Sequence, residues 1–193
     1  MLGQFCEWLH LLPLRWKLAL SAGAVLAPAA IIGIAGALGV RLNLTNSVPI
    51  GLYVISNGPE ARWVEFCPPE PFGTLSRERG YREWSRFGCP DGARPLLKPI
   101  AATAGDLVNV SPRGIEVNGK LIPHTAALHN DSMGRPIAAW PIGTYRVRQG
   151  SIWVASSFNT HSFDSRYFGP VSVFDVMATM CPVLTIAAEG SVS

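Results

Sequence analysis

Charged side chains are scarce in this sequence. Asp, Glu, Lys and Arg together make up 15% of the 193 residues, and the formal net charge is +3. So small a charge excludes a strongly basic nucleic-acid-binding protein, because such proteins gain affinity by neutralising many phosphates. We therefore expect no nucleic-acid partner. Lysine is rarer still, since Lys17, Lys98 and Lys120 are the only lysines among the 16 cationic side chains.

The sequence also lacks the usual signatures of metal and phosphate sites. Its four cysteines form no C-x-x-C pair, and there is no glycine-rich phosphate-binding loop. His124 and His129 have no cysteine or carboxylate partner at metal-ligand spacing, so we interpret both as surface residues. We therefore expect no metal ion and no cofactor.

Glycine (19 residues) and proline (16 residues) are plentiful, which favours a turn-rich β structure over a helical bundle. In residues 115–122, Asn118-Gly119 separates two alternating segments, which predicts a β-hairpin with a type I′ turn. Short runs rich in β-branched and aromatic residues predict further strands at 52–55, 145–148, 152–155 and 183–188. We interpret the polar run 162–170 as a loop. The fold class expected is mostly β and antiparallel.

One long apolar run precedes this domain. Residues 18–40 contain no charged side chain, and as a helix they would be about 34 Å long, enough to cross a bilayer. Arg15 and Lys17 precede the run and Arg41 follows it, so the positive-inside rule places the N-terminal side in the cytoplasm. We expect a cytoplasmic or interfacial segment at 1–17, a transmembrane anchor at 18–40 and an extracytoplasmic domain at 41–193.

Two other interpretations of the apolar run stay open. Ala35-Gly-Ala37 resembles the cleavage site of a secretory signal peptide, and a buried core helix is a further alternative. We favour a retained anchor, because the run is longer than the apolar part of a signal peptide. Ser47 follows the run closely, which would place it near the membrane–water boundary.

Residues 60–94 differ in character from their surroundings. They contain six acidic and six basic side chains whose charges cancel, which predicts a solvated insertion. One short helix is expected within residues 73–87. Cys67 and Cys89 flank the central part of the insertion, and they are either a disulfide, in an oxidising compartment, or two unpaired thiols.

Ser47 and Lys98 form a candidate catalytic pair. Pro49 and Gly51 constrain the backbone after Ser47. Lys98 alone among the lysines lies within an apolar run, and burial lowers the pKa of an amine. A lysine brought from ~10.4 towards ~7–8 can take the proton of a serine hydroxyl, which is a weak nucleophile unaided. The commoner interpretations are a plain loop serine and a lysine that reaches along a strand edge into solvent.

A second constellation uses the same serine. His161 lies three residues before Asp164, so a Ser47–His161–Asp164 triad is an alternative to the Ser–Lys pair. Spacing does not decide between the two, because triads assemble from residues far apart in sequence. His161 as an ordinary surface residue of a loop is the simpler interpretation.

Three motifs resemble those of the type I signal peptidases, and more closely those of the TraF-type conjugative-transfer peptidases. Thr45-Asn-Ser-Val-Pro-Ile-Gly-Leu-Tyr53 is similar to the nucleophile motif of that family. Leu96-Leu-Lys-Pro-Ile-Ala-Ala-Thr-Ala-Gly-Asp106 is similar to its lysine motif. Ser162-Phe-Asp-Ser-Arg-Tyr-Phe-Gly-Pro170 is similar to its third motif, which is the most specific. The motifs occur in family order, although Pro99 and Ala104 replace the common Arg and Pro.

The resemblance implies a role for each matching residue. Ser47 would be the acylating nucleophile and Lys98 its general base. Thr45 would aid the oxyanion hole together with the Ser47 main-chain N–H. Ser162 would orient Lys98, and Asp164 and Arg166 would form a supporting ion pair. The implied fold is a signal-peptidase-like β domain, and the insertion at 60–94 would be its variable part.

The resemblance further implies a membrane-anchored serine endopeptidase in the bacterial inner membrane, with its catalytic domain in the periplasm. Its partners would be the lipid bilayer and an exported or membrane-inserted pre-protein, with a conjugative pilin subunit favoured. In the TraF-type branch, cleavage can be coupled to cyclisation of the product. The alternatives are a general signal peptidase that removes leader peptides and a non-catalytic scaffold of a secretion or conjugation apparatus.

Overall fold

A computed structural model describes residues 13–86 and 88–186. Residue contacts divide the chain into two compact units. The boundary along the chain lies between Arg41 and Leu42. Most of the interfacial segment expected at 1–17 lies outside the described residues, as do the last two residues of the strand expected at 183–188.

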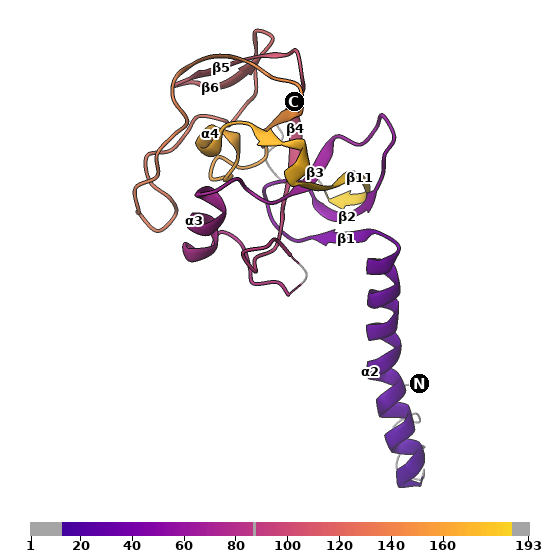
Figure 1. The fold of residues 1–193 in the computed structure, drawn as a ribbon. Coiled ribbons are helices and arrows are strands. Elements are labelled where there is room, and N and C mark those ends of the chain that lie inside the picture. The colour runs from indigo at the N-terminus through magenta and orange to yellow at the C-terminus, as the bar shows by residue number, and fades with distance from the viewer. Residues whose placement is uncertain (1–12, 87, 187–193) are drawn as a thin grey trace. The chain divides into compact units, whose positions relative to one another are not determined.

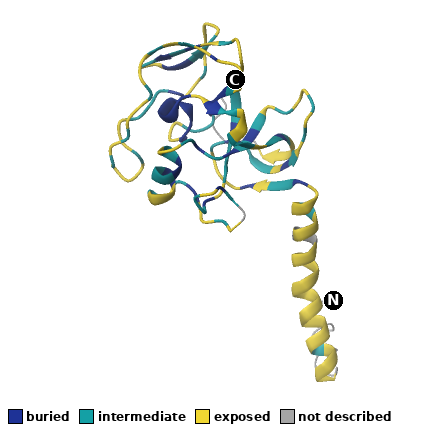
Figure 2. Ribbon diagram, viewed as in Figure 1, coloured by how far each residue is buried: buried dark blue, intermediate teal, exposed yellow. Residues whose placement is uncertain are grey.

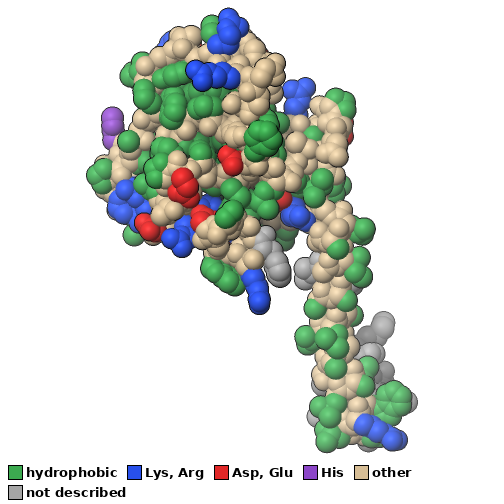
Figure 3. All heavy atoms as spheres, viewed as in Figure 1, with side chains coloured by type: hydrophobic (Ala, Val, Ile, Leu, Met, Phe, Trp, Pro, Cys, Tyr) green, Lys and Arg blue, Asp and Glu red, His purple; other side chains and the backbone are tan. Residues whose placement is uncertain are grey.

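The first unit contains one long helix, α2 (Leu14–Ala37), which follows Pro13. It begins four residues before the expected anchor, because Arg15 and Lys17 are part of its first turns. It ends three residues before the expected end, because Gly39 adopts a φ of 82°, which ends helices. Most of its described side chains are exposed (Figure 2), and many of these are hydrophobic (Figure 3). The helix is long and apolar enough to cross a membrane.

The second unit is built on a seven-stranded sheet with the order β1-β2-β11-β3-β4-β9-β10 (Figure 1). Every pairing from β2 to β10 is antiparallel. The strands are β1 (Val40–Asn43), β2 (Ile50–Ile55), β3 (Trp63–Phe66), β4 (Leu96–Ala102), β9 (Ser151–Val154), β10 (Val171–Ser172) and β11 (Val176–Ile186). Strand β11 is the longest and pairs with both β2 and β3.

A smaller sheet of four strands has the order β7-β6-β5-β8. Its strands are β5 (Leu107–Ser111), β6 (Gly114–Val117), β7 (Lys120–Leu121) and β8 (Gly143–Arg146). Asn118 and Gly119, with φ of 51° and 82°, form the turn between β6 and β7, which is the backbone geometry of the predicted hairpin. The prediction of a mostly β, antiparallel fold is confirmed.

Two buried apolar clusters fill the interior of the domain, and a third lies under the candidate nucleophile. The largest gathers side chains from β3, β9 and the helix α4 (Ser165–Phe168), including Phe66, Val154 and Phe168. The third consists of Val48, Tyr53 and Met180, with Leu97 among the residues packed against it. The residue after Ser47 is therefore anchored in the core.

The insertion was predicted at 60–94, and this predicted start is too early. Strand β3 lies at the centre of the large sheet between β11 and β4, and its Val64 and Phe66 are fully buried. The alternation of buried and less buried residues in β3 was missed by the sequence analysis, because Glu65 and the charged residues on both sides indicate a solvated segment. The excursion from the sheet starts after Phe66 and contains the expected short helix, α3 (Phe72–Glu78).

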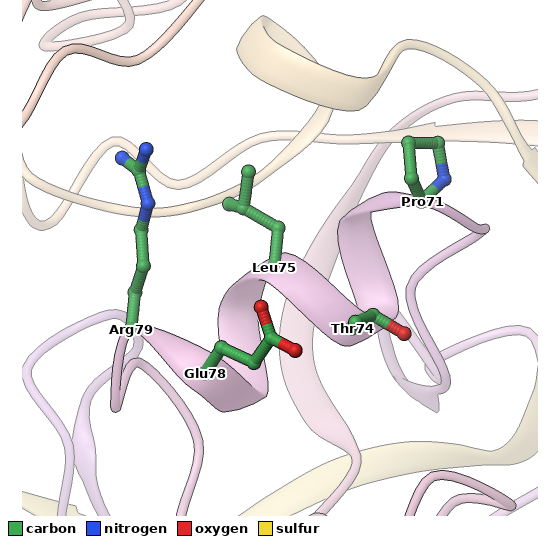
Figure 4. Close-up of a pocket in the computed structure, with 5 residues that line it drawn as sticks. All are labelled: Pro71, Thr74, Leu75, Glu78 and Arg79. Carbon is green, nitrogen blue, oxygen red and sulfur yellow. The ribbon is translucent and has the colours of Figure 1, made fainter.

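Two connections tie this excursion together. Cys67 and Cys89 form a disulfide, so the paired alternative holds and not the free thiols. Arg82 forms a buried ion pair with Asp91 and donates 2.7 Å and 2.8 Å hydrogen bonds to Gly73 O and Ser76 Oγ. A hollow of about 330 Å³ lies on α3, where Leu75 and Arg79 point to the same side (Figure 4). None of the sequence-predicted catalytic residues lines it.

Candidate active site

Ser47 lies in the loop that connects β1 to β2, here called the Ser47 loop (residues 44–49). It is half-buried, whereas the following Val48 is fully buried. Pro49 ends the loop, and the hydroxyl of Tyr53 donates a 2.7 Å hydrogen bond to its carbonyl. The candidate nucleophile is thus partly accessible to solvent, while buried Val48 and the Tyr53 hydroxyl fix the backbone that follows it.

Asn43, the last residue of β1, organises the same loop and was missed by the sequence analysis. Its Oδ1 accepts hydrogen bonds from the N–H and the hydroxyl of Thr45, at 3.2 Å and 2.8 Å. Its Nδ2 donates to the carbonyls of Thr45, Val48 and Pro49, at 2.9 Å, 3.2 Å and 3.2 Å. Asn and Asp side chains commonly bind the main chain of a turn two residues on, and this preference was the only signal in the sequence.

Lys98 lies in the middle of β4, and only 2% of the residue is exposed. Its Nζ donates a 2.8 Å hydrogen bond to Ser162 Oγ. Burial lowers the pKa of Lys98 to about 8; Asp164 opposes that shift and Arg166 adds to it. The neutral form of the amine, which a general base requires, is therefore far more populated near neutral pH than it is for an exposed lysine.

Asp164 and Arg166 form a fully buried ion pair beside this amine. Arg166 Nε donates to Asp164 Oδ1 at 2.8 Å, and Nη2 donates to Oδ2 at 2.9 Å. Asp164 also caps α4 by accepting from the main-chain N–H of Arg166. The remaining guanidinium donors bind the carbonyls of His124, Thr160 and Ser156.

The interpretation of residues 162–170 as a polar loop is therefore wrong. Every residue from Ser162 to Gly169 is buried, and α4 stands out as a buried element in Figure 2. Its polar groups are buried because they bond to one another and to the main chain, which removes the cost of leaving water.

Ser156 connects this buried segment to the Ser47 loop and was also missed. Its hydroxyl donates a hydrogen bond to the main-chain carbonyl of Ser47. Its N–H donates to Asp164 Oδ2 at 3.0 Å, and its carbonyl accepts from Arg166 Nη2 at 2.9 Å. Because its hydroxyl binds a main-chain carbonyl 109 residues away, no local pattern marked it.

The structure does not assemble the alternative triad. His161 is exposed, and both oxygens of Asp164 are occupied by Arg166 and by the Ser156 N–H. Thr45 is exposed, and its hydroxyl is directed to Asn43. Among the described residues, no hydrogen bond joins Lys98 to Ser47, and no group of three His, Cys, Asp or Glu side chains is arranged to hold a metal ion.

Comparison with known proteins assigns the chain to a family. The family described as "Signal peptidase, peptidase S26" matches residues 15–184. The chain belongs to this family. The resemblance of the three motifs is thereby confirmed, and the protein is a member of a family of peptidases.

Two relatives from Escherichia coli are both described as plasmid transfer protein TraF. One is 37% identical over 171 residues, covering 86% of this chain and 93% of the relative. The other is 34% identical over 173 residues, covering 86% of this chain and 96% of the relative. Among solved structures, a signal peptidase I from Enterococcus faecalis matches with a TM-score of 0.36 and 18% identity, over 65% of this chain and 97% of that one.

Proposed function

We propose that the protein is a membrane-anchored serine endopeptidase in which Ser47 is the nucleophile and Lys98 the general base. The observation that carries the proposal is the state of Lys98, which is 2% exposed, has a pKa lowered to about 8 and donates a hydrogen bond to Ser162. The ion pair that follows Ser162 binds Ser156, and Ser156 donates to the Ser47 carbonyl. A buried amine costs stability, and such groups concentrate at functional sites.

In the acylation step, Lys98 Nζ takes the proton of Ser47 Oγ while the oxygen forms a bond to the substrate carbonyl carbon. The tetrahedral intermediate collapses as the carbon–nitrogen bond breaks, and the leaving amine receives the proton held by Lys98. The Ser47 N–H, with the Thr45 hydroxyl after rotation away from Asn43, supplies the oxyanion donors. Ser162 holds the Lys98 amine in position through the 2.8 Å hydrogen bond.

The acyl-enzyme is then resolved by a second nucleophile. Water gives a linear product, whereas the amine at the other end of the same substrate chain gives a cyclic one. We propose a pilin precursor of a conjugation system as the substrate, because the relatives are described as plasmid transfer proteins. General removal of leader peptides is the competing activity of the same site.

The proposed location is the bacterial inner membrane, with α2 as its anchor and residues 42–193 as the periplasmic peptidase domain. The length and composition of α2 support the anchor. The disulfide between Cys67 and Cys89 supports an oxidising compartment for the domain, since cytosolic thiols are kept reduced.

The test is processing of a co-expressed pilin precursor by the full chain and by its Ser47→Ala and Lys98→Ala variants. We expect both variants to lose processing, whereas Ser132→Ala, which alters an exposed serine outside the site, keeps it. Processing by Ser47→Ala at the wild-type rate would leave only the scaffold role. The mass of the product then separates the two outcomes of the acyl-enzyme, because a cyclic product is lighter by one water.

A further inference from the structure

Three consecutive main-chain carbonyls beginning at Ser47 each accept a hydrogen bond from a side chain. Ser156 Oγ binds the carbonyl of Ser47, and Asn43 Nδ2 binds that of Val48 at 3.2 Å. Asn43 Nδ2, at 3.2 Å, and the Tyr53 hydroxyl, at 2.7 Å, bind that of Pro49. Loop carbonyls more often face water, so this arrangement fixes a stretch of backbone that would otherwise move.

These hydrogen bonds differ in the number of residues that separate donor and acceptor along the chain. Asn43 and Tyr53 belong to the strands that flank the Ser47 loop and lie six or fewer residues from the carbonyls they bind. Ser156 lies 109 residues from Ser47 along the chain. It is therefore the contact that places Ser47 relative to a distant part of the domain, whereas the others shape the loop itself.

Every polar atom of Ser156 forms a hydrogen bond. The residue is fully buried, its N–H binds Asp164 Oδ2 at 3.0 Å, and its carbonyl accepts from Arg166 Nη2 at 2.9 Å. The hydroxyl that donates to Ser47 accepts from the N–H of Phe158 at 3.1 Å, which directs its own proton toward the Ser47 carbonyl. The buried ion pair thus acts on the Ser47 loop through this residue.

The buried segment that begins at Ser162 holds the proposed base. Ser162, six residues after Ser156, accepts the 2.8 Å hydrogen bond of Lys98. Ser156 binds Asp164 and Arg166 through its main chain, and Ser162 lies two residues before Asp164, so the Ser47 loop and the amine are both held by residues connected to the same buried ion pair. A shift between them of about 1 Å is enough to cost roughly 100-fold in rate.

We propose that Ser156 is a positioning residue that sets Ser47 relative to Lys98 by holding the main-chain carbonyl of Ser47. This inference rests on the proposed function, since it assigns Ser156 a role in the acylation of Ser47. It goes beyond that function because Ser156 touches neither the reacting hydroxyl nor the amine.

Ser156→Ala is a sharp test, because two of the four hydrogen bonds of Ser156 survive it. The N–H to Asp164 and the carbonyl to Arg166 belong to the main chain, so the substitution removes only the hydroxyl contacts to Ser47 and Phe158. A matched control is Ser76→Ala in α3. Ser76 is also fully buried, donates to a main-chain carbonyl and accepts an N–H, from Arg82, but it lies outside the site.

The experiment measures acylation of the full chain in detergent by a fluorescent β-lactam, a class that acylates serines paired with a lysine. We expect the maximal acylation rate constant of Ser156→Ala to fall about 10- to 100-fold, with the half-saturating probe concentration changed less than about twofold. The pH midpoint of acylation should stay at the wild-type value, because the neighbours of Lys98 are untouched. Ser76→Ala should acylate at the wild-type rate.

The outcomes separate the two proposals. Labelling of Ser47→Ala as fast as the wild type, or no labelling of the wild type, removes the proposed function and this inference with it. Ser47-dependent labelling that is as fast in Ser156→Ala as in the wild type removes only the inference. A slow Ser156→Ala whose pH midpoint has moved, or whose thermal midpoint falls well below that of Ser76→Ala, shows a general disturbance and also counts against the inference.

If Ser156→Ala does not fold, Ser156→Cys replaces it, since a thiol keeps a similar volume with a weaker donor. The same criteria then apply to Ser156→Cys.

Discussion

Lys98 Nζ and Ser162 Oγ are joined by a buried hydrogen bond of 2.8 Å that links the centre of β4 to the segment before α4. Both residues are at most 2% exposed, so water does not compete for either atom. The contact restricts the amine to one position while burial keeps its pKa near 8. The following predictions test the amine, its neighbours and the scaffold that buries them.

The acylation rate should rise with pH and level off above about 8. Only the neutral amine accepts a proton, and the pKa of Lys98 is lowered to about 8 by burial. Single-turnover rates across a pH series measure the midpoint directly. A rate that is flat from about pH 6 to pH 9, or that still rises steeply near pH 10, would contradict the assignment of Lys98 as the base.

Lys98→Met should abolish acylation and yet raise stability at neutral pH. The folded pKa of about 8 lies below the unfolded value of about 10.4, so the unfolded chain binds more protons between these values and wild-type stability rises with pH across that window. Below it, the buried amine costs about 1–3 kcal/mol, which methionine removes.

Urea unfolding at several pH values checks this expectation. The advantage of Lys98→Met should shrink as the pH approaches about 10, where the wild-type amine is neutral in both states. Lys120→Met, at an exposed lysine, is the control and should leave the free energy of unfolding unchanged at each pH. A variant Lys98→Met that is less stable than the wild type at neutral pH would refute the cost assigned to the amine.

Asp164→Asn should move the midpoint of acylation to lower pH. The charge of Asp164 raises the pKa of Lys98, so its removal lets that pKa fall further, whereas Arg166→Gln should shift the midpoint upward by removing a charge that lowers it. Either change leaves one charge of the buried pair without its partner, at a cost of about 3–5 kcal/mol in stability. Shifts of the two midpoints in the same direction would show that geometry and not charge controls the amine.

Removal of the disulfide should destabilise the domain by about 3 kcal/mol without moving the pH midpoint of acylation. The bond closes a loop of 22 residues that lies outside the catalytic segments, and the loss of loop-closure entropy sets the magnitude. Thermal unfolding of Cys67→Ala/Cys89→Ala, with and without reductant, measures the effect. Cys181→Ser should keep the wild-type sensitivity to reductant, because Cys181 is a free cysteine.

The elements predicted from the sequence are those with a local signal. The hairpin at Asn118-Gly119, the apolar helix and the strands β2, β8 and β9 follow from alternation, turn chemistry or length, and the structure has them within a few residues. Strand β3 was missed because Glu65 interrupts its apolar character. Its central place depends on partners in β4 and β11 that no local pattern reveals.

The residues of the candidate site also differ in whether a local sequence signal could select them. Lys98 could be selected because an amine within an apolar strand stands out among only three lysines, and Ser47, Asp164 and Arg166 lie in recognisable motifs. Asn43 offered only the general preference of Asn for turns, and Ser156 offered no local signal, because its hydroxyl binds a main-chain carbonyl and every residue has one. Their importance depends on where the backbone runs, which is a property of the folded chain.

Strand β11 is the last described strand to leave the ribosome, yet it lies directly beside β2, which follows the Ser47 loop. Its Met180 is also one of the side chains that bury Val48. We therefore expect the segment that carries Ser47 to gain its full support only once the chain has been synthesised past Met180.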